Sequence, residues 1–121
     1  MSKKLSLRSA INGDFFEVPN RAIYGEECRT GLQSDSKLFY THIRDVFKLY
    51  AYEIEDDIFE IIHVSTDEHE DIYCKIEDID IEFLLKISES RVPMLLKELE
   101  SLDLISNIKN SEGFNIIYFK E

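Results

Sequence analysis

Carboxylates dominate the groups in this sequence that could do chemistry. Thirteen acidic side chains lie between Glu53 and Glu82, and Lys75 is the one Lys or Arg in that stretch. The two densest runs, at residues 67–71 and 78–82, have the spacings D-E-x-E-D and D-x-D-x-E. A calcium loop needs fixed ligand spacing and a glycine at its sharp turn, and these runs have neither. The stretch therefore indicates a solvated acidic face or a partner surface, with no metal and no cofactor.

The histidines and glycines form no catalytic motif. His42 falls on the apolar face of a predicted helix, which favours a core or interface role. His63 and His69 flank an acidic loop and have no nucleophile motif beside them. The four glycines build no phosphate-binding loop. We therefore expect a protein that is not an enzyme and that works by binding.

The cysteines and the apolar content indicate the compartment. Cys28 and Cys74 lack a CxxC pattern and any His spacing suited to zinc, so free, buried thiols are predicted. No apolar run approaches the roughly 18 residues of a membrane-spanning helix. The first ten residues, MSKKLSLRSA, lack the continuous apolar segment of a secretory signal. These features predict a cytoplasmic protein without membrane partners.

Charge is distributed unevenly along the chain. The formal net charge is −11; residues 1–50 carry eight Lys or Arg and six acids, whereas residues 51–121 carry six and nineteen. Affinity for DNA comes largely from neutralising phosphates with Lys and Arg. A surface of the opposite sign repels a duplex over about one Debye length, roughly 8 Å at physiological salt.

This charge favours a surface that imitates nucleic acid. Rows of carboxylates can pair with Arg and Lys side chains that otherwise hold phosphates. Small acidic inhibitors from phages and plasmids, including anti-CRISPR proteins, are similar in size and charge, an analogy of class alone. The predicted partner is a basic nucleic-acid-binding protein. The residues assigned to this surface are Glu53, Glu55, Asp56, Asp57, Glu60, Asp67, Glu68, Glu70, Asp71, Asp78 and Asp80.

The chain from Ile76 to Phe119 predicts a winged helix-turn-helix. Ile79, Phe83 and Leu84 recur at helical spacing, and Ser88 or Ser90 can cap a second helix. One apolar stripe then marks that helix: Val92, Leu95, Leu96, Leu99 and Leu102. Turn residues at 109–113 separate an apolar strand that begins at 104–105 from a second one at 114–119. The prediction is a single α+β domain over residues 1–121, with a C-terminal β-hairpin wing.

The upstream elements are less regular. Residues 1–13 are predicted as a loose or edge segment, and residues 14–18 as a strand before Pro19. A strong amphipathic helix follows, capped by Ser34 or Asp35 and continuing to Tyr50. Residues 58–64 fit either helix or strand; the β-branched run favours strand, with a hairpin loop at 65–70 before a strand at 72–76.

A family resemblance follows from these motifs. FFEVP at residues 15–19, SDSKLFY at 34–40, and LKIS at 85–88 leading into V-x-x-LLKELES at 92–101 resemble the N-terminal domain of the plasmid replication initiator A family. The similarity covers most of residues 14–108. It implies a dimerising winged helix that reads repeated duplex sites at a plasmid origin. If the protein is such a domain, we expect the homodimer to form through residues 34–50 or 1–24.

The resemblance also implies the DNA contacts. Those on the exposed face of the recognition helix would be Ser90, Arg91, Met94, Lys97 and Ser101, and those on the wing Lys109 and Asn110. In a helix that reads DNA, basic residues are expected, but Glu89 and Glu98 are acidic. Pro93 is a residue that only the first turn of a helix tolerates. Two functions therefore remain open: an acidic inhibitor of a nucleic-acid-handling protein, which charge favours, and a DNA-binding domain of an initiator or a related regulator.

Overall fold

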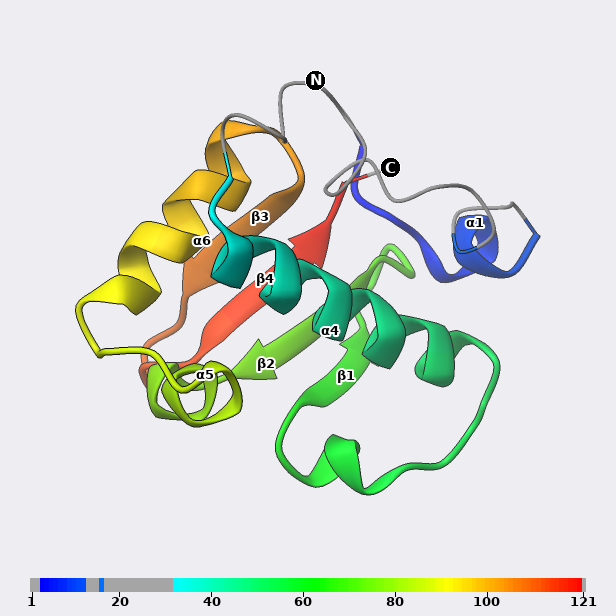
Figure 1. Cartoon of the computed structure of the whole chain (residues 1–121). Helices are drawn as coiled ribbons and strands as arrows, with labels where there is room; N and C mark the ends of the chain where they lie inside the picture. Colours follow the sequence, from blue (N-terminus) through cyan, green and yellow to red (C-terminus); the bar gives the residue numbers. More distant parts are fainter. Residues whose placement is uncertain (1–2, 13–15, 17–31, 121) are drawn as a thin grey trace.

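The computed structural model describes residues 3–12, 16 and 32–120. Its strands form one antiparallel sheet in the order β1-β2-β4-β3. Figure 1 shows α4 lying across one face of this sheet, with α5 and α6 on the side of the wing strands β3 and β4. The elements are α1 (Leu7–Asn12), α4 (Ser34–Ala51), the 3-10 helix η1 (Asp57–Glu60), β1 (His63–Thr66), β2 (Ile72–Ile76), α5 (Asp78–Leu85), α6 (Arg91–Ser101), β3 (Ile105–Lys109) and β4 (Asn115–Phe119).

The order of the C-terminal elements confirms the predicted α+β winged helix-turn-helix fold. Strand β2 leads into α5, a short turn leads into α6, and the β3–β4 hairpin follows. β4 then returns beside β2, with Cys74 opposite Ile117. This pairing closes the wing onto the helix-turn-helix. β1 is an additional strand on the outer edge, paired with β2 from His63↔Lys75 to Thr66↔Ile72.

Apolar side chains from α4, α6 and the sheet form the core. The ring of Phe119 on β4 stacks on Tyr40 at a centroid distance of 4.3 Å and meets Phe47 edge-on at 4.8 Å. On α6, the predicted stripe is confirmed, since Val92, Leu95, Leu96 and Leu99 are all buried. Burial of a large apolar side chain contributes roughly 1.5–3 kcal/mol, so α4 and β4 fix the scaffold on which α6 rests.

The predicted apolar face of α5 is wrong for Ile79 and Phe83 and right for Leu84, which packs against the core. Ile79 and Phe83 are 62% and 77% exposed, whereas Ile81 is fully buried. Residues 79 and 83 lie one turn apart on one side of the helix, and Ile81 lies roughly opposite them. Two apolar stripes compete in this sequence, and packing against the core selects the one that contains Ile81, Leu84 and Leu85.

The predicted strand at 58–64 is also wrong in position. Residues 57–60 form the 3-10 helix η1, in which the Asp56 carboxylate accepts a hydrogen bond from the Ile58 N–H at 2.9 Å. The strand begins only at His63. The predicted hairpin itself is confirmed, and the Asp67 carboxylate organises its turn by accepting hydrogen bonds from the N–H groups of His69 and Asp71.

The predicted helix caps are only partly right. Gln33 occupies the N-cap of α4 and makes no side-chain capping bond; Ser34 and Asp35 already belong to the first turn. Ser90 does occupy the N-cap of α6, but its hydroxyl lies 3.3 Å from that of Ser88 rather than capping the backbone. Asp35 is unavailable as a cap because it binds a side chain of α6, described below.

The N-terminal segment is more ordered than predicted. Lys4 forms an antiparallel bridge with Lys120 and Ser6 with Asp71, so residues 4–6 lie between the end of β4 and the start of β2. Leu5 between them is fully buried. Helix α1 then follows in place of a loose segment. The strand predicted at 14–18 falls, apart from residue 16, outside the described residues, as do the segment at 17–31 and Cys28.

Within the described residues, the helices are too short or too polar to cross a bilayer. Cys74 is a free thiol, as predicted, and it is fully buried. Burial raises the pKa of this thiol far above its ordinary value, so Cys74 acts as a core side chain rather than a nucleophile.

Candidate functional site

The outward face of α6 carries the residues predicted to read DNA. Ser90, Met94, Lys97 and Ser101 are all exposed, and Met94 is 57% exposed. Their spacing of four, three and four residues places them along one side of the helix. The opposite side is the buried stripe. This face therefore offers two hydroxyls, one ammonium and one thioether in a row.

Arg91 does not belong to this exposed face, which corrects its predicted placement. Its side chain is only 13% exposed and forms a two-pronged ion pair with Asp35 of α4. Arg91 Nε donates to Asp35 Oδ2 at 2.8 Å, and Nη2 donates to Asp35 Oδ1 at 2.7 Å. Nη1 donates to the Glu98 carboxylate two turns further along α6. Both carboxylates thus occupy the guanidinium that a phosphate would need.

The neighbouring polar groups complete this α4–α6 network. Ser36, which is fully buried, donates its hydroxyl to Glu98 Oε1 at 3.0 Å and accepts from Arg91 Nη2 at 3.2 Å. The Gln33 N–H also donates to Glu98 Oε1, at 3.3 Å. The network joins the first turn of α4 to the first two turns of α6. Its geometry indicates that Arg91 orients α6 against α4.

The pKa values follow from these contacts. The hydrogen bonds from Arg91 lower the pKa of Asp35 below its ordinary value, outweighing the effect of burial. Burial raises the pKa of Glu98, but the hydrogen bonds from Arg91 and Ser36 exceed this effect, so that pKa is also lowered. The pKa of Arg91 is raised, first by its bonds to Asp35 and then by those to Glu98. All three groups are charged at neutral pH.

The predicted wing residues lie beside the N-terminus of α5. Lys109 Nζ is 2.8 Å from Asp78 Oδ2, and the Lys109 side chain is 48% exposed. Asp78 Oδ1 in turn accepts from Asn115 Nδ2 at 2.6 Å. Burial raises the pKa of Asp78, but the bonds from Asn115 and Lys109 bring it below the ordinary value. A phosphate approaching Lys109 would compete with this carboxylate.

Asn110 shapes the turn of the wing. Its Oδ1 accepts from the N–H groups of Glu112 at 3.0 Å and Phe114 at 2.9 Å. Gly113 has a φ of +88°, a conformation that side chains disfavour, so glycine suits this turn. Asn110 is therefore a turn residue of the wing in this structure.

A groove runs between α6 and the wing. Its lining includes Lys97 and Glu100 of α6 and Asn107 and Lys109 of β3. Glu100 accepts a long hydrogen bond of 3.4 Å from the Asn107 N–H. The groove is thus lined by two lysines, Lys97 and Lys109, and by two carboxylates, Asp78 and Glu100, a mixed environment for any polyanion.

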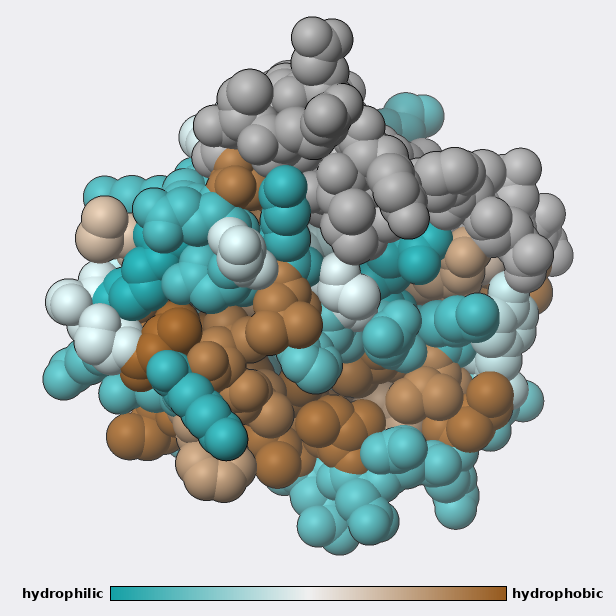
Figure 2. Space-filling view, viewed as in Figure 1, coloured by the Kyte–Doolittle hydropathy of each residue, from teal (hydrophilic) through white to brown (hydrophobic). Residues whose placement is uncertain are grey.

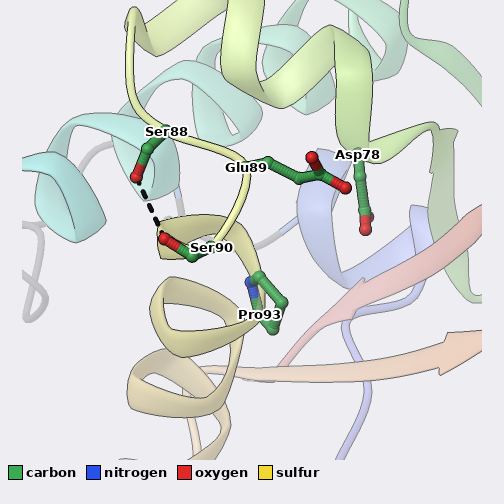
Figure 3. Close-up of a pocket in the computed structure, with 5 residues that line it drawn as sticks. All are labelled: Asp78, Ser88, Glu89, Ser90 and Pro93. Atoms are coloured by element: carbon green, nitrogen blue, oxygen red, sulfur yellow. Dashed lines mark hydrogen bonds between the residues drawn. The ribbon is translucent and has the colours of Figure 1, made fainter.

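A second hollow lies at the turn between α5 and α6. Asp78, Ser88, Glu89, Ser90 and Pro93 line it. Figure 3 shows the two serine hydroxyls turned toward each other, and the carboxylates of Glu89 and Asp78 extending into the same side of the hollow. Pro93 is compatible with α6 because its position in the first turn needs no N–H donor. Two adjacent carboxylates make this hollow a poor phosphate site.

The predicted acidic surface is divided between the two ends of the sheet. Because β1 and β2 are antiparallel, with His63 opposite Lys75, the segments before β1 and after β2 lie at one end. The β1–β2 turn, which carries Asp67, Glu68, Glu70 and Asp71, lies at the other. We call the first group the acidic end face. From the predicted surface it takes Glu53, Glu55, Asp56, Asp57 and Glu60 before β1 and Asp80 after β2. Glu77 and Glu82, which the prediction did not include, lie on the same segment as Asp80 and are added; Asp78 is left out because it pairs with Lys109.

Some of the predicted acids have structural partners. Asp67 accepts a hydrogen bond from the Tyr118 hydroxyl at 2.9 Å in addition to its turn contacts. Asp56 caps η1, and Asp78 holds Lys109. Glu68 is exposed and lies 3.6 Å from His69. The acidic groups on the end face are mostly exposed, and they define its charge.

The N-terminal lysines do not join the wing lysine. Lys4 pairs with Lys120, at the end of β4 that is remote from the wing turn. Its ammonium lies 3.9 Å from the centre of the Tyr118 ring. Lys109 lies at the opposite end, across from Asn115. Lys4 and Lys109 therefore do not merge into one positive face.

The described residues hold no cluster of three or more His, Cys, Asp and Glu side chains arranged to bind a metal ion. His42, predicted to be a core or interface residue, is exposed on α4. Sequence reasoning missed the buried polar partners Ser36 and Asn115, and the exposure of Phe83. A serine inside an otherwise apolar stripe of α4 was the one available signal.

Comparisons with known proteins bear on the fold. No protein-family model matches the chain, and no curated protein matches it. A solved structure described as the N-terminal domain of DNA binding protein is similar, with a TM-score of 0.60 and 18% identity. The similarity covers 100% of this chain and 85% of that one. At this level of identity the likeness establishes that the two chains share a fold.

Proposed function

We propose that this chain is a DNA-binding winged-helix domain that docks on duplex DNA through α6. The observation that supports the proposal best is the full-length structural likeness to the N-terminal domain of a DNA binding protein. The exposed row on α6 supplies a chemically suitable surface at the position where such folds place their recognition helix.

The proposed contacts differ in kind. Lys97 binds a phosphate or the acceptor edge of a guanine. Ser90 donates to phosphates, and Ser101 does so once its hydroxyl leaves the Glu98 carbonyl, to which it donates at 2.7 Å. Met94 makes an apolar contact with a thymine methyl group. Arg91 acts indirectly, by holding α6 against α4. Lys109 contacts the sugar–phosphate backbone of the DNA after its ion pair with Asp78 breaks.

The resemblance to the replication initiator A family gives a finer version of this proposal. In it the protein is cytoplasmic, dimerises, and recognises repeated sites at a plasmid origin or at a related regulatory region. The exposed side of α4, which carries Leu38 and His42, is available to a second copy.

Fluorescence anisotropy with a labelled random-sequence duplex tests the DNA-binding proposal. We expect micromolar binding at about 50 mM salt and a shallow salt slope of about −2 to −4, because few free cations lie on the docking face. Lys97→Ala should weaken binding and reduce the magnitude of the slope by about 1. Lys48→Ala, which removes an exposed lysine from α4, is the matched control and should bind like the wild type.

Absence of binding at protein concentrations up to about 100 μM in low salt would overturn the proposal, since even non-specific binders reach that range. Equal losses in Lys97→Ala and Lys48→Ala would also contradict it, because the effect would then be one of net charge alone. Thermal melts of both variants show that the fold is retained.

The acidic charge of the molecule supports a second candidate function. Residues 77–113, which contain the helix-turn-helix and the wing, hold four Lys or Arg and nine Asp or Glu. Arg91 and Lys109 are both engaged by carboxylates. We propose as this alternative that the acidic end face binds a basic protein that handles nucleic acid, and inhibits it. Failure to bind DNA, together with binding to a lysine-rich peptide, favours this candidate.

A further inference from the structure

Apolar side chains stand out from the acidic end face. On α5, Ile79 and Phe83 are exposed by 62% and 77%. On the segment between α4 and β1, Ile54 and Ile61 are exposed by 50% and 36%. Both segments lie at the same end of the sheet, as the β1–β2 register requires. Figure 2 shows hydrophobic surface gathered across the lower half of the molecule, from the region of α5 to that of η1.

Carboxylates border this apolar surface. The eight acids of the acidic end face lie on the same two segments as the four apolar residues. Lys86, at the end of α5, is exposed beside them. Lys75 is already engaged, because its ammonium lies 4.5 Å from the centre of the Phe114 ring. The surface therefore combines apolar anchors with a strongly negative border.

This combination selects a particular kind of partner. Ile79 and Phe83 are separated by one helical turn, the spacing at which a helix offers anchors to a helix laid against it. Carboxylates around such anchors attract Lys and Arg and speed association. A second copy of this chain would bring two negative borders together, and like charges across an interface cost several kcal/mol.

We propose that the acidic end face binds a cationic amphipathic helix of a partner protein. The apolar side of that helix packs on Ile79 and Phe83, and its Lys and Arg side chains pair with the surrounding carboxylates. This inference rests on the second candidate function and makes its partner specific. A purely electrostatic imitation of nucleic acid needs no apolar anchors, so the two ideas give different results.

Synthetic peptides test the inference. The probe is a two-heptad leucine–lysine peptide patterned as an amphipathic helix. The comparison peptides are a shuffled version without an apolar face, and a lysine–serine peptide of equal charge. We expect the amphipathic peptide to bind at least about tenfold more tightly than either comparison peptide, equivalent to about 1.4 kcal/mol.

Substitutions then locate the binding surface. The double variant Ile79→Ser/Phe83→Ser should lose this tenfold advantage. Ile108→Ser removes an apolar side chain that is 58% exposed on β3 of the wing, and it should leave peptide binding unchanged. Phe83→Gln alone is a milder variant if the double variant unfolds. Circular dichroism confirms that each variant is folded.

The outcomes separate the two ideas. Equal binding of the amphipathic and lysine–serine peptides overturns the inference but leaves the acidic-surface candidate standing. Full binding by Phe83→Gln and by a folded double variant also overturns the inference. If no peptide binds at about 100 μM in low salt, both ideas fail, because a surface with this net charge should retain weak affinity for polycations.

Discussion

Arg91 shows how a residue assigned to DNA contact from sequence can have a structural role. Its guanidinium is held by Asp35 through two parallel hydrogen bonds and by Glu98 through a third. The side chains of all three residues are at least three-quarters buried. Removing one partner of a partly buried ion pair lowers the free energy of unfolding, because the charge that remains no longer has an opposite charge beside it.

Replacing Arg91 should therefore destabilise the fold more than replacing a free cation. We expect Arg91→Met to lower the free energy of unfolding by about 2–4 kcal/mol, because Asp35 and Glu98 would be left facing each other. Lys97→Met on the same helix should change it by no more than about 0.5 kcal/mol. Urea denaturation of both variants measures the difference. Equal losses of stability in the two variants would show that the Arg91 network does not hold α6 in place.

The same residues predict a pH dependence. The folded-state pKa values of Asp35 and Glu98 are lowered, so their contribution is fully present above the unfolded values near about 4. It is lost as pH falls through the lower folded-state values. The stability gap between wild type and Arg91→Met should therefore narrow between about pH 6 and pH 3. Urea midpoints at both pH values test this; a constant or widening gap would contradict it.

At the scale of the element, α5 illustrates how packing resolves an ambiguous pattern. Its eight residues carry apolar side chains on both sides, and its neighbours decide which side is buried. Ile81 is fully buried in the core cluster, whereas Phe83 faces solvent. The prediction from spacing chose the wrong side because the helix is too short for one stripe to dominate.

Two substitutions on α5 test this assignment. Ile81→Ala should cost about 2–4 kcal/mol, since it leaves a cavity in the core. Phe83→Ser should change the free energy of unfolding by no more than about 0.5 kcal/mol, although it removes the larger side chain. Chemical denaturation of the two variants gives the comparison. A larger loss for Phe83→Ser would show that α5 is rotated relative to the structure described.

For the whole molecule, the net charge of −11 is the dominant property. Self-repulsion of like charges destabilises the compact state, and the acidic end face concentrates that repulsion at one end of the sheet. The same field disfavours DNA and favours cationic partners. The DNA-binding candidate therefore needs a positive surface and uses α6. The inhibitor candidate needs a negative surface and uses the acidic end face.

Salt should stabilise the fold. Raising sodium chloride from about 20 to 500 mM shortens the screening length from roughly 20 to 4 Å and weakens this repulsion. We expect the urea midpoint to rise, and the rise to shrink when Glu53, Glu55 and Glu60 are replaced together by glutamine. A midpoint that falls with salt would show that ion pairs such as Arg91–Asp35 outweigh the repulsion.

The sequence alone determined the order of the elements around α6. The stripe from Val92 to Leu99 and the turn residues at 109–113 predict α6 and the wing, because helical and hairpin periodicities are local properties of the chain. The uneven charge was also evident, since it is a matter of composition. Residues 57–66 were assigned less well, because their apolar spacing fits both a helix and a strand, and residues 57–60 form a 3-10 helix.

Only the tertiary structure decided which residues meet. Arg91 and Asp35 are 56 positions apart, and no local pattern indicates that one would hold the other. The exposure of Phe83 and the division of the acids between two ends of the sheet likewise depend on how α5 and the β1–β2 hairpin pack. Periodicity reports the neighbours of a residue along the chain, whereas charge pairing and solvent exposure are set by neighbours in space.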